Sequence, residues 1–244
     1  MAKSEDGGIC MSDYFVFNGV SSKDYGVVFD LQTDNASSWQ YSTVQIPGRN
    51  GDLVYSNNRF PNVDHMYSLV VYDDFETNYM NMRNKLLAPK GYCRLEDSIH
   101  ADEYYMAVIN GDIEPVIITD RSIGKCEVAF TRKPQRYLKS GETVKQFTAS
   151  GAITNPTLFT AKPLLRIYGV GTLQIGDGAI AISYADTYTD IDCETMEAYK
   201  GTFSCNGRVS VSGYDFPQLT PGENGVILGA GITRVDVTPR WWRI

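Results

Sequence analysis

The sequence predicts a mainly β protein, with an N-terminal β-barrel or β-sandwich domain that carries one helix, followed by a C-terminal antiparallel β-sandwich. Three observations support this fold class. Tyr is abundant, and other residues with high strand propensity recur along the whole chain. Short apolar runs are separated by turn dipeptides such as Asn18-Gly19 and Asn206-Gly207. A convincing helical spacing of apolar residues occurs in one stretch only.

The first elements are two apolar strands joined by a polar turn. We expect these strands at 14–17 and 26–29. Their aromatic side chains alternate with smaller or polar ones, so Phe15, Phe17 and Phe29 are the candidate core. A polar loop with a single tryptophan, for which partial burial is the favoured role, leads to the next element.

That element is a hairpin with a tight tip. Strands are expected at 42–46 and 53–55, and the dipeptides Pro47-Gly48 and Asn50-Gly51 between them demand a reversal. Glycine accepts the positive φ of such turns, so the residues between the glycines are held outward. An outward arginine on a stiff tip suits contact with another chain. The candidate subunit-interface residues are therefore Gly48, Arg49, Asn50 and Gly51, and an ordinary surface hairpin is the alternative that the local sequence favours.

The rest of the N-terminal half predicts further strands and the one helix. Strands are expected at 65–72, 91–96, 104–109, 112–118 and 124–131. The helix is expected at 77–87, capped by Asp73 or Asp74 and stopped by Pro89. Its apolar stripe comprises Tyr79, Met82, Arg83, Leu86 and Leu87.

Beyond 132–141, a basic stretch with Pro and Gly, the helical pattern is absent. We place the domain boundary there, so that residues 1–12 form an extension, 13–139 the first domain and 140–244 the second. Short runs separated by turns predict an antiparallel sandwich or jelly roll in the second domain. These runs are 143–148, 163–168, 172–175, 179–184, 190–194, 208–211, 225–228 and 233–238.

Charge and targeting signals limit the partners. The 244 residues include 22 Lys and Arg against 29 Asp and Glu, a formal net charge of −7. No basic block is present, and phosphate binding needs a concentrated positive patch, so we expect no nucleic acid and no membrane partner. The first residues lack the apolar run of a signal peptide, and no stretch is apolar enough to span a bilayer.

Residues with reactive or metal-binding side chains are sparse. The five cysteines lack Cys-x-x-Cys spacing, which suits reduced thiols and leaves one disulfide open. His65 and His100 have no ligand partners at zinc spacing, so no metal and no cofactor is expected. The motifs of serine hydrolases, phosphate loops and zinc proteases are absent, and no catalytic residue is assigned.

Two acidic groups are candidate sites. Glu96, Asp97, Asp102 and Glu103 could provide two carboxylates for a glycoside hydrolase, but a solvated hairpin loop is the preferred interpretation. Asp186, Asp190 and Asp192 lack the loop of a calcium motif. Trp241 and Trp242 are the possible aromatic platform for a ligand or partner, although adjacent strand residues face opposite ways, which predicts burial of at least one.

Several stretches in a fixed order carry a resemblance that no single one carries alone. In the first half they are Phe15-Val16-Phe17-Asn18-Gly19, Asp24-Tyr25-Gly26, Ile46 to Leu53, Gly91-Tyr92 after the single helix, and Val128-Ala129-Phe130 before the basic stretch. In the second half they are Asn155-Pro156-Thr157, Pro163 to Gly171, Ile191-Asp192-Cys193, Phe216-Pro217-Gln218-Leu219 and Pro221-Gly222-Glu223-Asn224. Together they resemble the distal tail protein family of long-tailed bacteriophages, often called Dit.

The resemblance implies a structural virion protein without catalysis. In that family the first domain closes into a hexameric ring at the tip of the tail, between the major tail tube protein and the tail-associated hub protein. The second domain, a sandwich similar to galectins or carbohydrate-binding modules, projects outward and in many phages docks receptor-binding proteins. The implied location is the virion tail tip, assembled in the host cytoplasm. A non-catalytic carbohydrate-binding protein, and more remotely a hydrolase, remain the alternatives.

Overall fold

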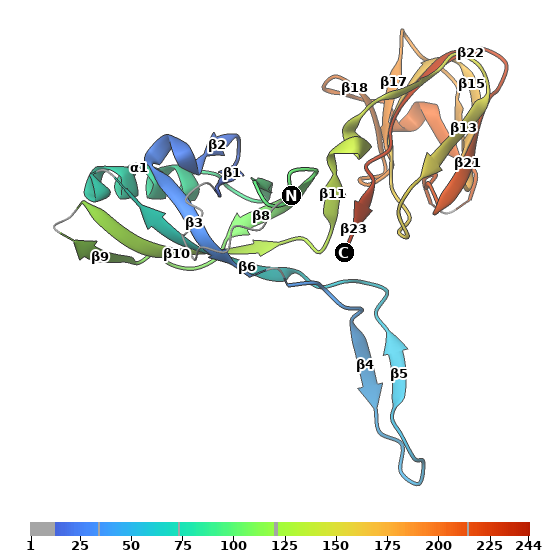
Figure 1. Cartoon of the computed structure of the whole chain (residues 1–244). Coiled ribbons are helices and arrows are strands. Elements are labelled where there is room, and N and C mark those ends of the chain that lie inside the picture. Colours follow the sequence, from blue (N-terminus) through green and yellow to red (C-terminus); the bar gives the residue numbers. More distant parts are fainter. Residues whose placement is uncertain (1–12, 34, 73, 120–121, 214) are drawn as a thin grey trace, which may run out of the picture. The chain divides into compact units, whose positions relative to one another are not determined.

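The computed structural model describes residues 13–33, 35–72, 74–119, 122–213 and 215–244. The expected extension at 1–12, with Cys10, lies outside these ranges. Contacts divide the chain into two compact units, the first ending at Arg136 and the second beginning at Tyr137. Each unit is built mainly from antiparallel strands (Figure 1), so the mainly β fold class is confirmed.

Unit 1 is one curled sheet with a helix against one face. Its strands are β1 Phe15–Phe17, β2 Val20–Ser21, β3 Val27–Gln32, β6 Val63–Val71, β7 Cys93–Asp97, β8 Glu103–Ile109, β9 Pro115–Thr119 and β10 Ile123–Arg132. They run in the order β2-β1-β7-β8-β10-β6-β3, and β9 also pairs with β10. Two further strands, β4 Tyr41–Val44 and β5 Leu53–Ser56, pair only with each other among the described residues. The helix is α1 Phe75–Leu87, and a short 3-10 turn, η1, spans Ser22–Tyr25.

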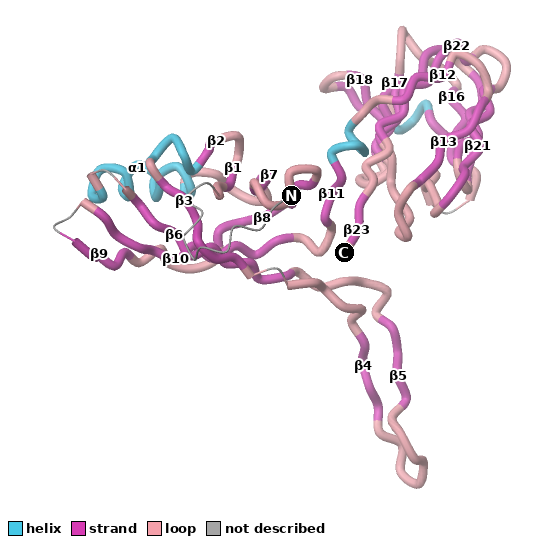
Figure 2. Tube along the Cα trace, viewed as in Figure 1, coloured by secondary structure: helices cyan, strands magenta, loops and turns pink. Residues whose placement is uncertain are grey.

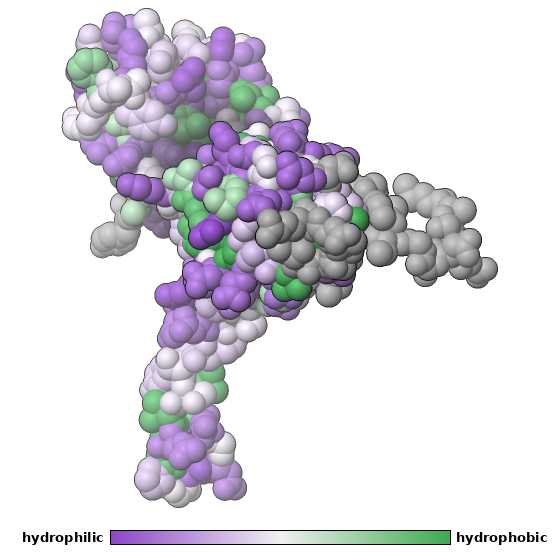
Figure 3. Space-filling view, turned by 90° about the vertical axis from the view of Figure 1, so that its left-hand side faces the viewer, coloured by the Kyte–Doolittle hydropathy of each residue, from purple (hydrophilic) through white to green (hydrophobic). Residues whose placement is uncertain are grey.

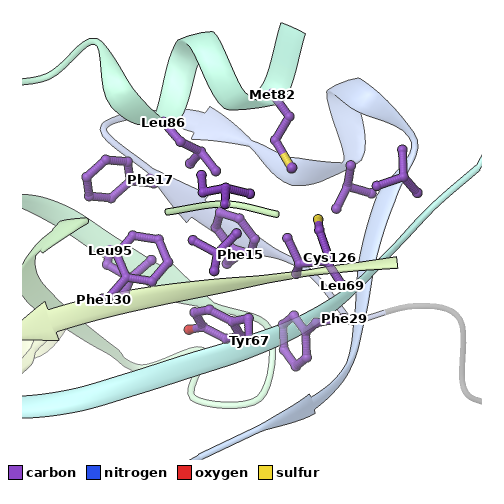
Figure 4. Close-up of a cluster of buried hydrophobic side chains, with 14 of the residues drawn as sticks. Phe15, Phe17, Phe29, Tyr67, Leu69, Met82, Leu86, Leu95, Cys126 and Phe130 are labelled. Carbon is purple, nitrogen blue, oxygen red and sulfur yellow. The ribbon is translucent and has the colours of Figure 1, made fainter. Parts of the chain in front are cut away.

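The core of unit 1 lies between α1 and the sheet. Figure 4 shows Met82 and Leu86 of the helix above side chains of the strands, and the predicted core aromatics Phe15, Phe17 and Phe29 are all buried. Close approach needs a small residue beneath the helix. A Cβ atom on Gly124 of β10 would lie 2.3 Å from the Phe75 ring, so this position must remain glycine for the helix to pack here.

The helix prediction needs three corrections, which concern the start, the stripe and the cap. Phe75 starts the helix and is buried, whereas Arg83 and Leu87, both placed on the stripe, are exposed, Leu87 to 48%. Asp74 precedes the helix with φ 53°, and its carboxylate makes no capping hydrogen bond. Burial of Phe75 against the sheet, rather than a side-chain cap, therefore sets the start of the helix. Asp73 lies outside the described residues.

The strand predictions in unit 1 were correct in place and mostly in exposure. The 65–72 run is part of β6, which lies between β10 and β3. In β10, Cys126, Val128 and Phe130 are buried while Lys125 and Glu127 are exposed, which confirms the expected alternation. Arg132, assigned from the sequence to the basic stretch, is instead the last residue of β10 and only 2% exposed.

Unit 2 is a sandwich of two antiparallel sheets around one core. Its elements are β11 Arg136–Leu138, which begins at the division, η2 Lys139–Glu142, β12 Lys145–Phe147, β13 Gly151–Asn155, β14 Leu164–Gly169, β15 Gly171–Ile175, β16 Gly178–Ile182, β17 Thr189–Asp192, β18 Glu197–Lys200, β19 Phe203–Ser204, η3 Asn206–Arg208, β20 Val209–Val211, β21 Gly222–Leu228, β22 Ile232–Thr238 and β23 Trp242–Arg243. The six-stranded sheet is β12-β22-β14-β17-β18-β19 and the five-stranded sheet is β13-β21-β15-β16-β20. Figure 2 shows the strands of this unit in magenta.

The predicted sandwich is thus confirmed, but several of its strands escaped prediction. β11, β13, β18, β19 and β23 lie outside the eight expected runs. β18 has the sequence Glu-Ala-Tyr-Lys, in which one small residue is buried between polar ones. So short and polar a strand is defined by its pairing with β17 rather than by its own pattern.

Four of the five cysteines lie within the described ranges. Cys93, Cys126, Cys193 and Cys205 are free, and the last three are buried. Burial raises the pKa of the Cys126 thiol to about 12, which keeps it protonated and unreactive near neutral pH. None of the described helices has the length and apolar character needed to cross a bilayer.

Candidate functional site

The candidate site is the hairpin that extends from the sheet of unit 1, here called the arm and defined as residues 40–57. Figure 1 shows β4 and β5 leaving the sheet as a long two-stranded ribbon that continues β3 and β6. The path from the sheet is held by backbone hydrogen bonds. The Thr33 amide donates to the Met66 carbonyl at 3.1 Å, and the Gln40 amide donates to the Arg59 carbonyl at 3.0 Å.

The arm ends in the tight reversal that the sequence predicts. The Arg49 amide donates to the Ile46 carbonyl at 3.1 Å, while Gly48 and Gly51 have φ values of 80° and 79°. L-residues other than glycine rarely adopt these angles, so the turn depends on both glycines. Arg49 and Asn50 are exposed, and Arg49 forms no ion pair with another described residue. The structure therefore brings the four predicted interface residues together at the tip.

Both faces of the arm carry exposed apolar side chains, because residues paired directly across the ribbon share a face. One face has Tyr41 opposite Ser56 and Thr43 opposite Val54, and the other face has Tyr55 and Val44. Tyr41, Val54, Tyr55 and Val44 are each between 49% and 56% exposed. Figure 3 shows hydrophobic residues in green along the arm. An isolated two-stranded hairpin is marginally stable in water, so such a ribbon is typical of a segment that is covered in an assembly.

The base of the arm is anchored by polar and aromatic contacts. Trp39 and Phe60 face each other across the ribbon with ring centroids 4.1 Å apart, which leaves Trp39 45% exposed. Arg132, buried at the end of β10, donates from its guanidinium to the Asn35 carbonyl. The same guanidinium lies 4.3 Å from the centroid of the Tyr105 ring. These contacts connect the arm to the core of unit 1.

Two of the acidic residues around the 97–103 turn are buried, which corrects the prediction of a solvated loop. Asp97 is 5% exposed and accepts from the His100 amide at 2.7 Å and from the Tyr67 hydroxyl at 3.3 Å. Burial, together with the nearby Asp97 carboxylate, raises the pKa of Tyr67 well above its usual range, so this hydroxyl remains a donor. Glu103 is 2% exposed and pairs with Arg136 at 2.7 Å. Both carboxylates therefore hold structure in place.

The two C-terminal tryptophans do not form a paired platform. Trp241 is 4% exposed and belongs to the core of unit 2, so its ring is unavailable to a ligand. The burial expected of at least one of them is found here. Trp242 is half-buried, stacks on Phe159 with centroids 4.5 Å apart, and donates from its indole nitrogen to the Thr160 carbonyl at 2.9 Å. The face of Trp242 covered by Phe159 cannot stack on a sugar as well.

Asp186, Asp190 and Asp192 of unit 2 each form an ion pair with a basic residue. Arg166 donates to both oxygens of Asp190 at 2.6 and 2.9 Å, and Arg240 donates to both oxygens of Asp192 at 2.7 and 2.9 Å. Asp186 pairs with Lys200 at 2.7 Å. Within the described ranges, no group of three or more His, Cys, Asp or Glu side chains is placed to hold a metal ion.

Two solved structures of phage proteins align with this chain over most of its length. The Dit protein of phage SPP1, described as a paradigm of the hub adsorption apparatus in phages that infect Gram-positive bacteria, aligns with a TM-score of 0.71 and 16% identity. The alignment covers 92% of this chain and 98% of that one. A chain of the phage P2 baseplate in its activated conformation with Ca aligns at a TM-score of 0.55 and 11% identity, over 92% and 96% of the two chains.

These likenesses show a shared fold, so the resemblance to distal tail proteins drawn from the sequence is confirmed at the level of the fold. No family model matches the sequence, and no curated protein matches it either. Residue identity is thus too low to transfer any site residue by alignment. The role of the arm therefore rests on the contacts and exposure of its own residues.

Proposed function

We propose that this chain is a structural protein of the tail tip of a long-tailed phage or prophage. Six copies would form a ring that joins the tail tube to the hub and the host-adhesion proteins. The observation that carries the proposal is the shared fold over 92% of this chain and 98% of the SPP1 Dit chain, so that both units are included. A match restricted to one sandwich would have been compatible with many unrelated functions.

Unit 1 is the part that we assign to the ring. Its arm has apolar side chains on both faces, and these side chains contact little within the described chain. Exposed apolar area of this kind favours burial against another protein, at roughly 25 cal/mol per Å² removed from water. A ring requires a contact between different surfaces of successive copies, and a projecting arm provides one such surface.

Unit 2 is the part that we assign to docking of other tail proteins. Its two sheets enclose their own core, and several of its acidic side chains pair with arginine or lysine of the same unit. A self-sufficient sandwich can be displayed outward without depending on the ring. The proposed partners are the major tail tube protein and the hub protein on the ring, and a receptor-binding protein on unit 2.

The first test is the mass of the protein in solution and the symmetry of its particles. The monomer has a mass of 27.2 kDa, and light scattering is expected to detect a species about six times heavier. Negative-stain images of that species should show six-fold rings. Immunogold labelling of phage particles should place the chain at the tail tip. Labelling on the capsid or along the tube would refute the proposal.

The second test addresses the tip of the arm. Arg49→Glu should weaken ring formation while leaving thermal unfolding of the monomer unchanged, because Arg49 is exposed and has no ion pair in the described chain. Lys23→Glu, an exposed charge change outside the arm, is the control. An oligomer of unchanged mass and stability in Arg49→Glu would remove this loop from the interface.

A further inference from the structure

A groove in unit 1 is left unfilled by the described residues. It lies beside β10, where β8 has stopped pairing and β9 begins, and it encloses about 650 Å³. Ligand pockets usually measure ~300–1,000 Å³, so the groove is large enough for a side chain and part of a turn. Leu69 borders it but is buried in the core of unit 1, so the exposed apolar side chain of the groove is Val116, which is 64% exposed.

The groove is acidic. Asp112, Glu114 and Glu127 line it, and Lys125 is the one basic residue among the described residues of the lining. All four side chains are exposed, and none of the three carboxylates forms an ion pair with another described residue. A cation that enters the groove meets several carboxylates that have no ion-pair partner among the described residues. The complementary ligand is therefore cationic with an apolar portion.

The tip of the arm has this composition. Arg49 is the one basic residue of residues 40–57, and Ile46 next to the turn is 40% exposed. A guanidinium can donate to two carboxylates at once, which suits a groove with several acids better than an ammonium would. The tip is also stiff, so little conformational entropy is lost when it binds.

The positions of the arm and the groove along β6 keep the arm of one copy away from the groove of the same copy. The arm leaves unit 1 next to Val63, the first residue of β6, whereas the groove is lined by Ser68 and Leu69 further along that strand. Strands rise about 3.3 Å per residue, so the arm from Gln40 to Pro47 extends roughly 23 Å beyond the sheet. A domain of this size has a radius of gyration of about 14 Å, so the tip reaches well outside its own unit.

We propose that the acidic groove of unit 1 receives the arm tip of a second copy of this chain, with Arg49 between the carboxylates. This inference rests on the proposed ring and names the surface that the ring contact uses. Tip and groove are different surfaces at opposite ends of one sheet. Contact between them is head to tail, and repeated contacts of this type generate a closed ring when the rotation closes.

The test is a charge exchange in the full chain, measured as association constants by sedimentation over a range of protein and salt concentrations. Arg49→Glu and Glu127→Arg should each weaken association by about tenfold or more, since close charge pairs at interfaces can be strongly coupled. The double variant should recover to within about threefold of the unchanged protein. Association of the unchanged protein should also weaken with salt.

Controls separate this contact from general charge effects and from failure to fold. Glu223→Arg makes the same charge change on exposed β21 in unit 2 and should leave association unchanged. Thermal unfolding of each variant should match that of the unchanged protein. If Arg49→Glu weakens association but Glu127→Arg neither weakens it nor rescues it, the tip binds elsewhere and the groove assignment is overturned.

Two other outcomes also overturn it while leaving the proposed function to its own tests. One is association that none of the variants changes. The other is an unchanged protein that stays monomeric at every concentration, because tip and groove are then present together and do not bind. In both cases labelling of phage particles still decides whether the chain belongs to the tail tip.

Discussion

The arm of unit 1 and the sheets of unit 2 contain the same kinds of residue but bury them differently. Val44 and Val54 in the arm are 49% and 56% exposed, while Val235 and Val237 in β22 are fully buried. Both pairs lie in antiparallel strands with complete cross-strand partners. The difference is that β22 belongs to a sheet with a second sheet packed on it, whereas the ribbon of β4 and β5 has no second layer within the described chain.

This contrast shows that strand pairing and burial are separate properties. Pairing satisfies the backbone groups that face the partner strand, and a hairpin achieves this alone, but removal of apolar side chains from water requires a second layer. Unit 2 contains both of its layers. The arm contains one, and we attribute the missing layer to other subunits. Variants that probe each region should therefore affect different measurements.

The largest expected effect on folding comes from the core of unit 2. Leu165→Ala in β14 removes a fully buried side chain and should destabilise unit 2 by about 2–5 kcal/mol. Val54→Ala in the arm should change the free energy of unfolding by no more than about 0.5 kcal/mol. Guanidinium denaturation followed by tryptophan fluorescence measures both, since Trp241 lies in the same core as Leu165 and Trp39 packs on Phe60 at the base of the arm. Equal losses in the two variants would contradict the contrast.

A smaller effect is expected at the base of the arm. Arg132→Met removes the guanidinium that donates to the Asn35 carbonyl, so a part-buried hydrogen bond from a charged donor is lost at a cost of about 1.5–3 kcal/mol. Limited proteolysis should then cut faster between 33 and 40. The matched control is Arg83→Met on the exposed side of α1, which should leave both the stability and the cleavage rate unchanged.

A pH-dependent effect is expected in unit 2. Burial acts to raise the pKa of Asp192, but the hydrogen bonds from Arg240 outweigh it and hold this pKa below its usual range. A carboxyl with a lowered folded-state pKa stabilises the fold above the unfolded value of about 3.9, and this contribution is lost as pH falls through the folded value. Asp192→Asn should cost about 1–2 kcal/mol at pH 7. Its stability should also fall less steeply than that of the unchanged protein below about pH 4, as measured by urea titrations at several pH values.

The smallest effect on folding and a clear effect on assembly are expected in the arm. Val54→Asp should leave the unfolding of the monomer within about 0.5 kcal/mol of the original, because Val54 is already largely exposed. Association should weaken, because the proposed partner would have to bury a carboxylate. Ile227→Asp in β21, where the side chain is 52% exposed, is the matched control in unit 2. Equal loss of association in both variants would show that exposed apolar residues in general, rather than the arm, drive assembly.

Local patterns in the sequence were enough for most of the strands, for the existence of the helix and for the tip of the hairpin. The period-two alternation of β10 and the glycines of the turn report directly on backbone geometry, which is a local property. The start of α1 was misplaced because Phe75 is helical only through its burial against β10, and that contact joins residues far apart in the chain.

The candidate site could be predicted only in part. The tip residues were identified from turn chemistry, but the groove next to β9 has no local signal, since its carboxylates come from a loop and from a strand that meet only in the fold. The buried positions of Asp97 and Glu103 were equally hidden. Acidic residues beside a turn are usually solvated, and only the approach of Tyr67 and Arg136 reverses that expectation.

By itself the sequence determined that this chain forms antiparallel strands, one helix and a stiff hairpin tip with an outward arginine, because dihedral preferences and apolar spacing act over a few residues. The tertiary structure alone decided which of those strands would be covered. Burial depends on partners distant in the chain, and it left the arm exposed on both faces while it enclosed the sandwich of unit 2 on itself.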